Sequence, residues 1–435
     1  MLTENLAAIV GAEHVSTDPD VLATRATDWT SRYRGTASAL VRPGSTDEVA
    51  AVLRTCRDAG AYVTVQGGRT SLVAGTVPEH DDVLLSTERL TDIDDVDTAS
   101  RRVRVGAGVT LAELQCVANA AGLLLGVDLA ARDSATVGGM VSTNAGGLRT
   151  VRYGTMGEQV LGLEVALPDG SVVHDEASLF VGAEGTLGVI TAVDVRLHPV
   201  PEHRVTALCG FADLESLVSA GRIFRGIETI AALELIDGRA AALAAEHLGL
   251  PNPAPGEWLL LIELAADMDP TSRLADALGR MPVCAEPAVG VDAATQQRLW
   301  RVRESVAEVV GLFGPPVKFD VSLPLSAIPS FEQQSAALIR QHAPTGLPLL
   351  FGHIGEGNLH LNVLRCDAKQ ESRIYPEMMN LIAAHGGNVS SEHGVGSRKR
   401  AYLAMSRSPA EIAEMRAIKI AFDPTGYLNP AVLFD

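Results

Sequence analysis

Two short histidine-bearing segments of this chain have the pattern of a hairpin that could hold a metal ion. Residues 350–353 and 359–363 read as strands joined by a glycine-containing turn. Strand alternation places His360 and Asn362 on one face. If the strands pair symmetrically about the turn, His353 lies opposite His360, with Cβ atoms about 5 Å apart. Two imidazoles at that separation can share one divalent ion.

A carboxylate would complete such a site, and Glu392, which is followed by His393 further along the chain, is the best candidate. A lone histidine in a strand is usually structural, but two facing histidines with a nearby Glu-His pair favour a metal centre. Neighbouring residues of an extended segment point to opposite sides, so we expect different roles for Glu392 and His393. Imidazole and carboxylate ligands suit zinc or manganese, and the sequence does not choose between them.

Three glycine-rich segments in the first half of the chain are typical of backbone that approaches a ligand closely. They cover residues 65–75, 133–147 and 182–190. Glycines and small hydroxyl residues after a strand expose successive backbone N–H groups, which can bind phosphate without a basic side chain. None of the segments is a P-loop or a Rossmann fingerprint. One segment alone would favour a plain turn, but three together favour an extended ligand such as a dinucleotide.

The composition is that of a globular protein with several domains. The chain has 435 residues, 47% of them hydrophobic and 20% charged, which predicts two or three domains. A formal net charge of −18 argues against a nucleic-acid partner. We find neither a transmembrane segment nor a signal peptide. The five cysteines are scattered, which argues against a thiolate metal site and favours a reducing compartment, so we expect a cytoplasmic protein.

The predicted secondary structure changes near residue 200, from mostly short strands to helices that alternate with a strand. Before it, short strands are expected at 39–41, 61–65, 83–86, 102–105, 162–167 and 188–197, with a helix at 46–59 that Thr46 to Glu48 cap. Beyond it, helices are expected at 217–225, 240–247 and 300–309 and a strand at 258–263. This second pattern is that of an α+β domain. The last helix starts at Ala410 and leads into a turn near Asn429.

The glycine-rich segments resemble the FAD domain of the vanillyl-alcohol oxidase, or PCMH, superfamily. The resemblance implies an α+β fold: a PCMH-type FAD-binding domain over 1–200, an α+β substrate (cap) domain with the metal site over 201–390, and a C-terminal segment over 391–435 that returns to the flavin. The first loop would hold the pyrophosphate of a non-covalent FAD, and the later segments would line its ribityl, flavin and adenine. The implied FAD contacts are Gln66, Gly67, Gly68, Arg69, Thr70, Ser71, Ser134, Thr136, Gly138, Gly139, Ser142, Asn144, Gly146, Gly147, Glu184, Gly185, Gly188, Ile190 and Asn429.

Four further motifs narrow the resemblance to the D-2-hydroxyglutarate dehydrogenases, with D-lactate dehydrogenases and the flavin subunit of glycolate oxidase as close relatives. The motifs are residues 28–30, 318–324, 391–396 and 428–430, and the resemblance runs from Asp28 to Phe434. It implies His353, His360 and Glu392 as metal ligands and His393 as catalytic base. It also places Arg303 and Lys318 where relatives hold substrate carboxylates, and Asn358 among the substrate contacts.

The expected reaction is oxidation of a D-2-hydroxy acid to the 2-oxo acid. The metal would bind the 2-hydroxyl and a carboxylate oxygen, His393 would remove the hydroxyl proton, and the C2 hydride would pass to the flavin. D-2-hydroxyglutarate is the first choice of substrate and D-lactate the alternative. A non-catalytic flavin-binding electron-transfer subunit is an alternative of another class, and the intact metal and base residues argue against it. The acceptor (an electron-transfer flavoprotein or a quinone) and the oligomeric state (a homodimer is one option) stay open.

The sequence departs from the family pattern in three places. Ala307 stands where relatives have a threonine that contacts substrate, one helical turn after Arg303. Between Val173 and Leu179 the chain lacks a segment that most relatives carry, which affects the pocket wall or the approach of the acceptor. Arg69 replaces a smaller residue. The first of these permits a monocarboxylate substrate.

Overall fold

The computed structural model describes residues 2–175 and 179–434, which form two compact units. The first unit consists of the chain up to Gly146, Gly154–Val200, and the segment from Glu392 onward. The second consists of Gly147–Tyr153 and Pro201–Ser391. Residues 147–153, expected in the first domain, thus belong to the second unit. The shortened connection predicted between Val173 and Leu179 includes residues 176–178, which lie outside the described residues.

The described part of the first unit is built on two four-stranded sheets and one two-stranded sheet, which pairs its sixth and tenth strands. Its strands are β1 (Val15–Ser16), β2 (Ala37–Val41), β3 (Val63–Gln66), β4 (Asp82–Ser86), β5 (Arg102–Gly106), β6 (Leu123–Leu124), β7 (Val160–Ala166), β8 (Val172–Asp175), β9 (Val189–Arg196) and β10 (His198–Pro199). Its helices are α1 (Leu2–Val10), α2 (Pro19–Arg25), α3 (Thr46–Asp58), α4 (Leu111–Ala120), α5 (Val137–Thr143), α7 (Met156–Gln159) and α14 (Pro409–Phe422).

One sheet has the order β1-β2-β4-β3 with β2, β4 and β3 parallel, and the other has the antiparallel order β5-β9-β7-β8. Helix α3 connects β2 to β3 and buries Val49, Val52 and Leu53 in the shared core. Its cap is Ser45, whose hydroxyl accepts a hydrogen bond from the Glu48 N–H, so the predicted cap at Thr46 to Glu48 is wrong by one residue.

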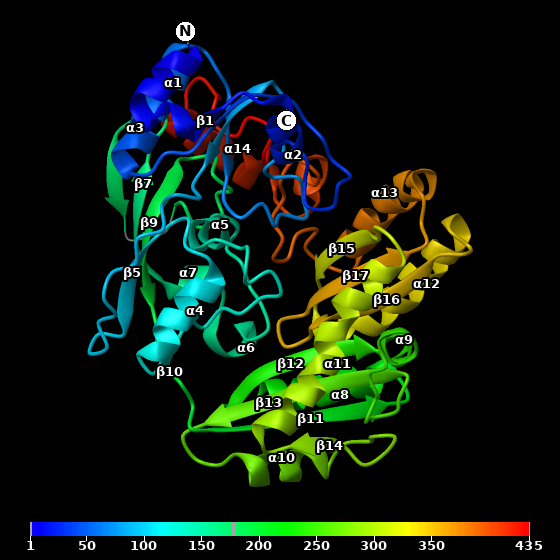
Figure 1. Cartoon of the computed structure of the whole chain (residues 1–435). Helices are drawn as coiled ribbons and strands as arrows, with labels where there is room; N and C mark the ends of the chain where they lie inside the picture. Colours follow the sequence, from blue (N-terminus) through cyan, green and yellow to red (C-terminus); the bar gives the residue numbers. More distant parts are fainter. Residues whose placement is uncertain (1, 176–178, 435) are drawn as a thin grey trace. The chain divides into compact units, whose positions relative to one another are not determined.

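The C-terminal segment returns to the start of the first unit, and Figure 1 shows its red ribbon beside the blue N-terminal elements. Leu428 forms a parallel bridge to Val63, at the beginning of β3. Lys419 in α14 donates hydrogen bonds to the carbonyl oxygens of Thr186 and Leu428, both at 2.8 Å. The last helix therefore anchors the chain end beside the third glycine-rich segment.

The second unit is a seven-stranded antiparallel sheet with the order β14-β11-β13-β12-β16-β17-β15. Its strands are β11 (His203–Phe211), β12 (Ile230–Asp237), β13 (Trp258–Ala266), β14 (Ala288–Gly290), β15 (Val317–Ser322), β16 (Leu347–His353) and β17 (Asn358–Leu364). Its helices are α6 (Thr150–Tyr153), α8 (Leu214–Arg225), α9 (Gly238–Leu248), α10 (Thr271–Leu278), α11 (Ala293–Leu312), α12 (Ile328–His342) and α13 (Ala368–Ala384).

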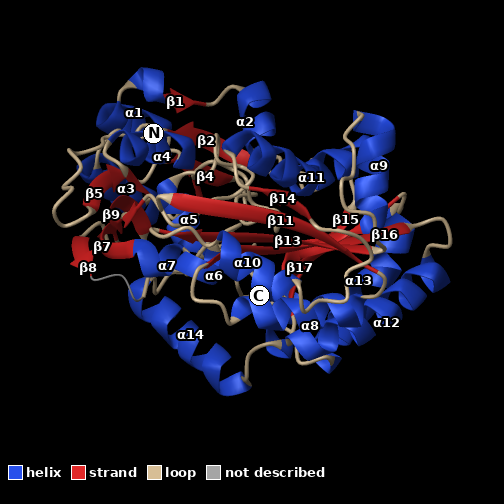
Figure 2. Cartoon of the chain, turned by 90° about the horizontal axis from the view of Figure 1, so that it is seen from below, coloured by secondary structure: helices blue, strands red, loops and turns tan. Residues whose placement is uncertain are grey.

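Helices cover both faces of this sheet. Figure 2 shows α9 and α11 on one side and α8, α12 and α13 on the other. Helix α11 has 20 residues and begins after Asp292, whose side chain accepts a hydrogen bond from the Thr295 N–H. It packs Leu299, Val302 and Val306 against the sheet, in one core with Phe351. Its length exceeds the predicted helix at 300–309.

Two further sequence expectations concern the whole chain. None of the helices in the described part of the chain has the length and apolar character that crossing a lipid bilayer requires. All five cysteines are free thiols, and Cys56 and Cys209 among them are buried.

Candidate active site

The predicted histidine hairpin consists of β16 and β17. His353 pairs with Asn358, and His360 pairs with Phe351, so the predicted pairing of His353 with His360 is wrong by two residues. The turn occupies only residues 354–357, which shifts the register. A shift of two residues keeps each side chain on its face, because the side-chain period of a strand is two. The two imidazoles therefore remain neighbours, with ring centroids 5.5 Å apart.

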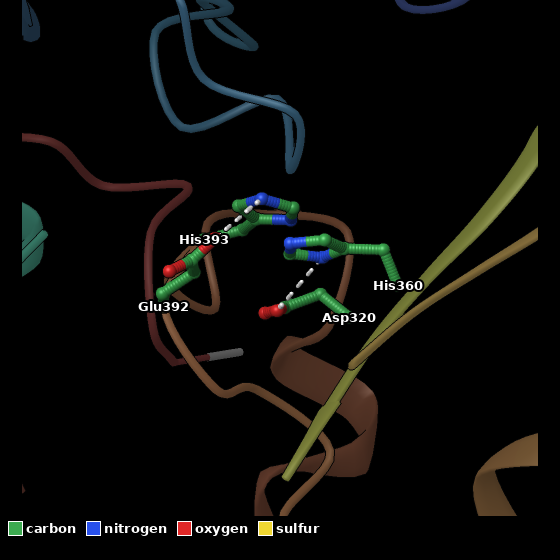
Figure 3. Close-up of side chains that lie close together, drawn as sticks. All are labelled: Asp320, His360, Glu392 and His393. Atoms are coloured by element: carbon green, nitrogen blue, oxygen red, sulfur yellow. Dashed lines mark ion pairs between the residues drawn. The ribbon is translucent and has the colours of Figure 1, made fainter. Parts of the chain in front are cut away.

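Strand β15 adds a carboxylate to this face of the sheet. Asp320 pairs with His360, and its Oδ1 lies 3.9 Å from His360 Nδ1. Asp320 is buried, and its Oδ2 accepts a hydrogen bond of 2.9 Å from the backbone N–H of Ser391. Ser391 is the last residue of the second unit. The peptide chain then places Glu392 and His393 directly beside Asp320 (Figure 3).

Four side chains make up a cluster that could hold a metal ion: Asp320, His360, Glu392 and His393. One ligand atom from each lies within 4.8 Å of the others. The cluster joins three residues predicted from the sequence to Asp320, which was missed. Strand alternation from Lys318 to Ser322 puts Asp320 on one face of β15, but nothing in the sequence pairs that strand with β17.

Glu392 and His393 point into the same cluster, with His393 Nε2 3.6 Å from Glu392 Oε1. The expectation that they point to opposite sides is wrong. The backbone bends over residues 391–393 instead of running as a strand, and Gly394 follows with φ +81°. Alternation applies only to an extended backbone.

His353 lies outside this four-residue group and contacts a different carboxylate. Its Nδ1 is 2.6 Å from Glu234 Oε1, and the second Glu234 oxygen accepts a hydrogen bond of 2.7 Å from Arg303 Nε. All three side chains are buried. Burial alone would raise the pKa of Glu234, but the charges of His353 and Arg303 together hold it below its ordinary value. Glu234 was not predicted from the sequence.

The predicted substrate residues lie on or above the same face of the sheet. Arg303 extends from α11 over the ring of Phe351, with its guanidinium carbon 4.9 Å from the ring centroid. Lys318 is half-buried in β15, two residues before Asp320. Asn358 is buried, and within the described residues its Oδ1 has no hydrogen-bond partner. Ala307 is exposed on α11.

The turn of the hairpin contains a further perturbed carboxylate. Burial raises the pKa of Glu356 to about 7, although the charge of His353 opposes the shift. Within the described residues its Oε1 has no hydrogen-bond partner. Sequence reasoning treated this residue only as part of the turn.

The first two glycine-rich segments lie against each other in the first unit. A Cβ on Gly68 would lie 1.8 Å from the carbonyl oxygen of Ser134, and one on Gly67 would lie 2.5 Å from Thr136 Oγ1. Only glycine fits at this approach. Gly67 to Ser71 remain partly exposed, while Gln66 is buried and donates hydrogen bonds to the carbonyl oxygens of Arg25 and Thr76. The partly exposed residues of the first loop are accessible to a ligand.

Other predicted FAD residues hold the segments together. The Glu184 carboxylate accepts hydrogen bonds from the N–H groups of Val395 (2.7 Å) and Gly396 (2.8 Å). Asn429 donates to the Glu184 carbonyl oxygen and accepts from the Val65 N–H. Burial raises the pKa of Glu184, against the effect of its hydrogen bonds. The third glycine-rich segment is thereby tied to the loop that follows His393.

The remaining predicted FAD residues are placed as follows. Asn144 accepts a hydrogen bond from the Gly157 N–H, and Ser142 donates one to the carbonyl oxygen of Gly138. Gly188 lies against β7, since a Cβ there would be 2.6 Å from Val165 Cγ1, and Ile190 is buried in β9. Gly146 ends the first unit's opening segment, and Gly147 begins the short segment that belongs to the second unit.

Two protein families match most of the chain. The FAD binding domain family matches residues 37–176, and the C-terminal domain of FAD linked oxidases matches residues 200–433. The chain is 31% identical to the D-2-hydroxyglutarate dehydrogenase of Stutzerimonas stutzeri, over 100% of this chain and 98% of the relative. It is 34% identical to the mitochondrial D-2-hydroxyglutarate dehydrogenase of Danio rerio, over 95% and 81%. It is 33% identical to the D-2-hydroxyglutarate–pyruvate transhydrogenase of Saccharomyces cerevisiae, over 95% and 89%.

Solved structures of distant sequence share the fold. A substrate-bound p-cresol methylhydroxylase superposes with a TM-score of 0.82 at 17% identity, over 100% of this chain and 96% of that one. An alkyldihydroxyacetonephosphate synthase gives 0.76 at 15%, over 99% and 84%. These likenesses confirm the predicted fold class, a PCMH-type FAD-binding domain with an α+β second domain. The chain therefore belongs to the FAD-linked oxidases that include the D-2-hydroxyglutarate dehydrogenases, and it is an FAD-dependent oxidoreductase.

Proposed function

We propose that this protein oxidises D-2-hydroxyglutarate to the corresponding 2-oxo acid, with FAD as hydride acceptor and a bound zinc or manganese ion. The carrying observation is the partly buried group of imidazoles and carboxylates beside the sheet face that also bears Lys318. The names of relatives that cover almost the whole chain support the choice of substrate. A non-catalytic flavin-binding subunit would have no use for such a group.

The donor set fits a divalent metal. We assign His353, His360 and Glu392 as the ligands, with His353 binding through Nε2 because Glu234 takes up its Nδ1. Asp320 supplies another nearby carboxylate. Imidazole and carboxylate oxygen are the ligands that zinc and manganese accept.

The other residues of the site have separate proposed roles in catalysis and in substrate binding. A metal held by these residues would supply Lewis-acid polarisation of the substrate's 2-hydroxyl, and a bound FAD would supply the hydride acceptor for C2. His393 accepts the 2-hydroxyl proton as general base. Among the described residues, Arg303 makes its side-chain hydrogen bond through Nε to Glu234, so its terminal nitrogens can bind a substrate carboxylate. Lys318 supplies a second cation, and Asn358 offers an amide oxygen that can accept a hydrogen bond from the substrate.

D-lactate is the second candidate substrate, and Ala307 is the observation that favours it. A methyl group on α11 one turn after Arg303 offers no hydroxyl to a distal carboxylate. The acceptor can be an electron-transfer flavoprotein or a quinone. A 2-oxo acid should be tested too, because a relative is named a transhydrogenase with pyruvate. The free cysteines are consistent with the cytoplasmic location that we propose.

The purified protein is expected to be yellow, with FAD bound without a covalent link. Gly67 to Ser71 are partly exposed, so the backbone N–H groups of the first loop can supply the affinity for FAD. Acid precipitation should release the flavin into the supernatant, where its absorbance can be measured. Colourless protein that cannot be reconstituted with FAD would contradict the assignment.

Lys318→Ala is expected to remove most of the preference for a dicarboxylate. A charge-assisted hydrogen bond to a buried carboxylate contributes ~1.5–3 kcal/mol, roughly tenfold to a hundredfold in kcat/KM. D-2-hydroxyglutarate should therefore lose far more kcat/KM than D-lactate. Exposed Lys369, in the first turn of α13, provides the matched control as Lys369→Ala. Equal losses for both acids would mean that Lys318 binds the carboxylate they share.

A further inference from the structure

We propose that Glu234 is a positioning residue that fixes the metal ligand His353 with one carboxylate oxygen and the substrate-binding Arg303 with the other. The inference rests on the proposed function, which gives His353 and Arg303 these roles. The inference adds Glu234 to the proposed site. This residue lies on β12, a strand that contains none of the site residues predicted from the sequence. The consequence is that metal binding and substrate binding share one buried anchor.

The geometry of this anchor is set by the sheet. Glu234 on β12 pairs directly with His353 on β16, so the two side chains leave the sheet side by side on the same face. Glu234 Oε1 lies 2.6 Å from His353 Nδ1. Arg303 reaches down from α11, and its Nε donates a hydrogen bond of 2.7 Å to Glu234 Oε2. The exposed fractions of the Glu234, His353 and Arg303 side chains are 1%, 7% and 8%.

The contact to Glu234 determines which nitrogen of His353 can bind a metal. A carboxylate only accepts hydrogen bonds, so His353 Nδ1 must carry the proton. The lone pair of the neutral ring then lies on Nε2, and a carboxylate behind Nδ1 also raises the basicity of that nitrogen. The ring of His360 is 5.5 Å away and perpendicular, close enough for both rings to serve one ion.

The same carboxylate fixes the orientation of Arg303. Its guanidinium is held at Nε by Glu234 and on its face by the ring of Phe351. These two contacts fix the orientation of the planar guanidinium, so that its two terminal nitrogens can make a bidentate contact with a substrate carboxylate. Glu234 also balances the charge of an arginine that is itself buried, and an unbalanced buried charge is strongly destabilising.

Glu263 provides a matched control on the neighbouring strand. It is buried on the same face of the sheet, where its carboxylate accepts a hydrogen bond from Trp300 Nε1 (2.8 Å) and lies 3.3 Å from Arg149 Nε. These contacts anchor α11 and the segment 147–153. Among the described residues these contacts involve neither His353 nor Arg303, so Glu263→Gln tests the loss of a buried carboxylate that touches neither the proposed ligand nor the substrate-binding arginine.

The test compares Glu234→Gln with Glu263→Gln in the FAD-loaded protein. Zinc affinity is measured by competition with a chromophoric chelator, and kcat and KM are measured with D-2-hydroxyglutarate. Loss of a carboxylate behind a ligand histidine typically weakens metal binding ~10–100-fold. We expect that loss for Glu234→Gln together with a raised KM, and unchanged zinc affinity for Glu263→Gln. If Glu234→Gln does not fold, Glu234→Asp provides the test. It keeps the negative charge, but its side chain is one methylene shorter and should no longer contact His353 Nδ1 closely, so zinc binding should be weaker.

Arg303→Met distinguishes two ways in which Glu234 could support zinc binding: by orienting His353, or by neutralising the charge of Arg303. Alone it should raise KM and leave zinc affinity unchanged. Combined with Glu234→Gln it should leave the zinc defect in place, because the neutral amide of glutamine accepts a hydrogen bond but does not supply the carboxylate charge that raises the basicity of His353 Nε2. Restoration of zinc binding in the double variant would overturn the proposal, since Glu234 would then act only by neutralising Arg303. Equal zinc affinity of the wild type and Glu234→Gln would also overturn it, whereas a wild type that binds no zinc would refute the metal site itself.

Discussion

His360→Ala is expected to have no measurable turnover at ordinary zinc or manganese concentrations. His360 belongs to the four-residue group and has His353 as its ring neighbour, so its loss would remove an imidazole ligand from the proposed site. A site built from so few protein ligands binds its ion far more weakly when one is lost. In the wild type, a chelator should abolish activity and added zinc or manganese should restore it. Metal content after dialysis, measured by atomic absorption, gives the direct readout.

His203→Ala provides the control for this substitution. His203 is an exposed histidine at the start of β11, in the same sheet but on a strand that bears none of the proposed ligands. Its removal should change neither metal content nor turnover. Metal-dependent activity in His360→Ala at the wild-type level would contradict the assignment of His360 as a ligand.

His393→Ala is expected to keep the metal and lose most turnover, while Glu392→Ala loses the metal. A positioned general base typically contributes ~10²–10⁴-fold to the rate, and we expect a fall in kcat of that order. Both side chains enter the same cluster, with His393 Nε2 3.6 Å from Glu392 Oε1, so proximity alone does not separate their roles. Metal content and kcat of the two variants, measured side by side, separate them.

The opposite outcome has a defined meaning. If His393→Ala loses the metal and Glu392→Ala keeps it, His393 is a ligand and the base lies elsewhere in the cluster. Asp320 would then be the next residue to test, because it is the buried carboxylate beside His360.

Local pattern predicted the faces of several side chains of the proposed site, and the family resemblance supplied their expected roles. Alternation in residues 359–363 placed His360 and Asn362 on one face, and the glycine-rich segments indicated a backbone that approaches a ligand. The error of two residues in the β16–β17 register did no harm, because a strand repeats every two residues and each side chain kept its face. The helix predicted at 300–309 corresponds to α11, which is longer and spans Ala293–Leu312.

Contacts between distant segments were decided only by the tertiary structure. Glu234 precedes His353 by 119 residues, and no local period relates a residue of β12 to a residue of β16. Asp320 meets His360 only because β15 pairs with β17, and Glu392 and His393 converge only because the backbone bends after Ser391. Periodicity follows from the geometry of one segment, so the sequence alone predicts which face a side chain takes. Strand order and backbone bends depend on packing of the whole chain, so the partners of that side chain emerge only when the sheet is assembled.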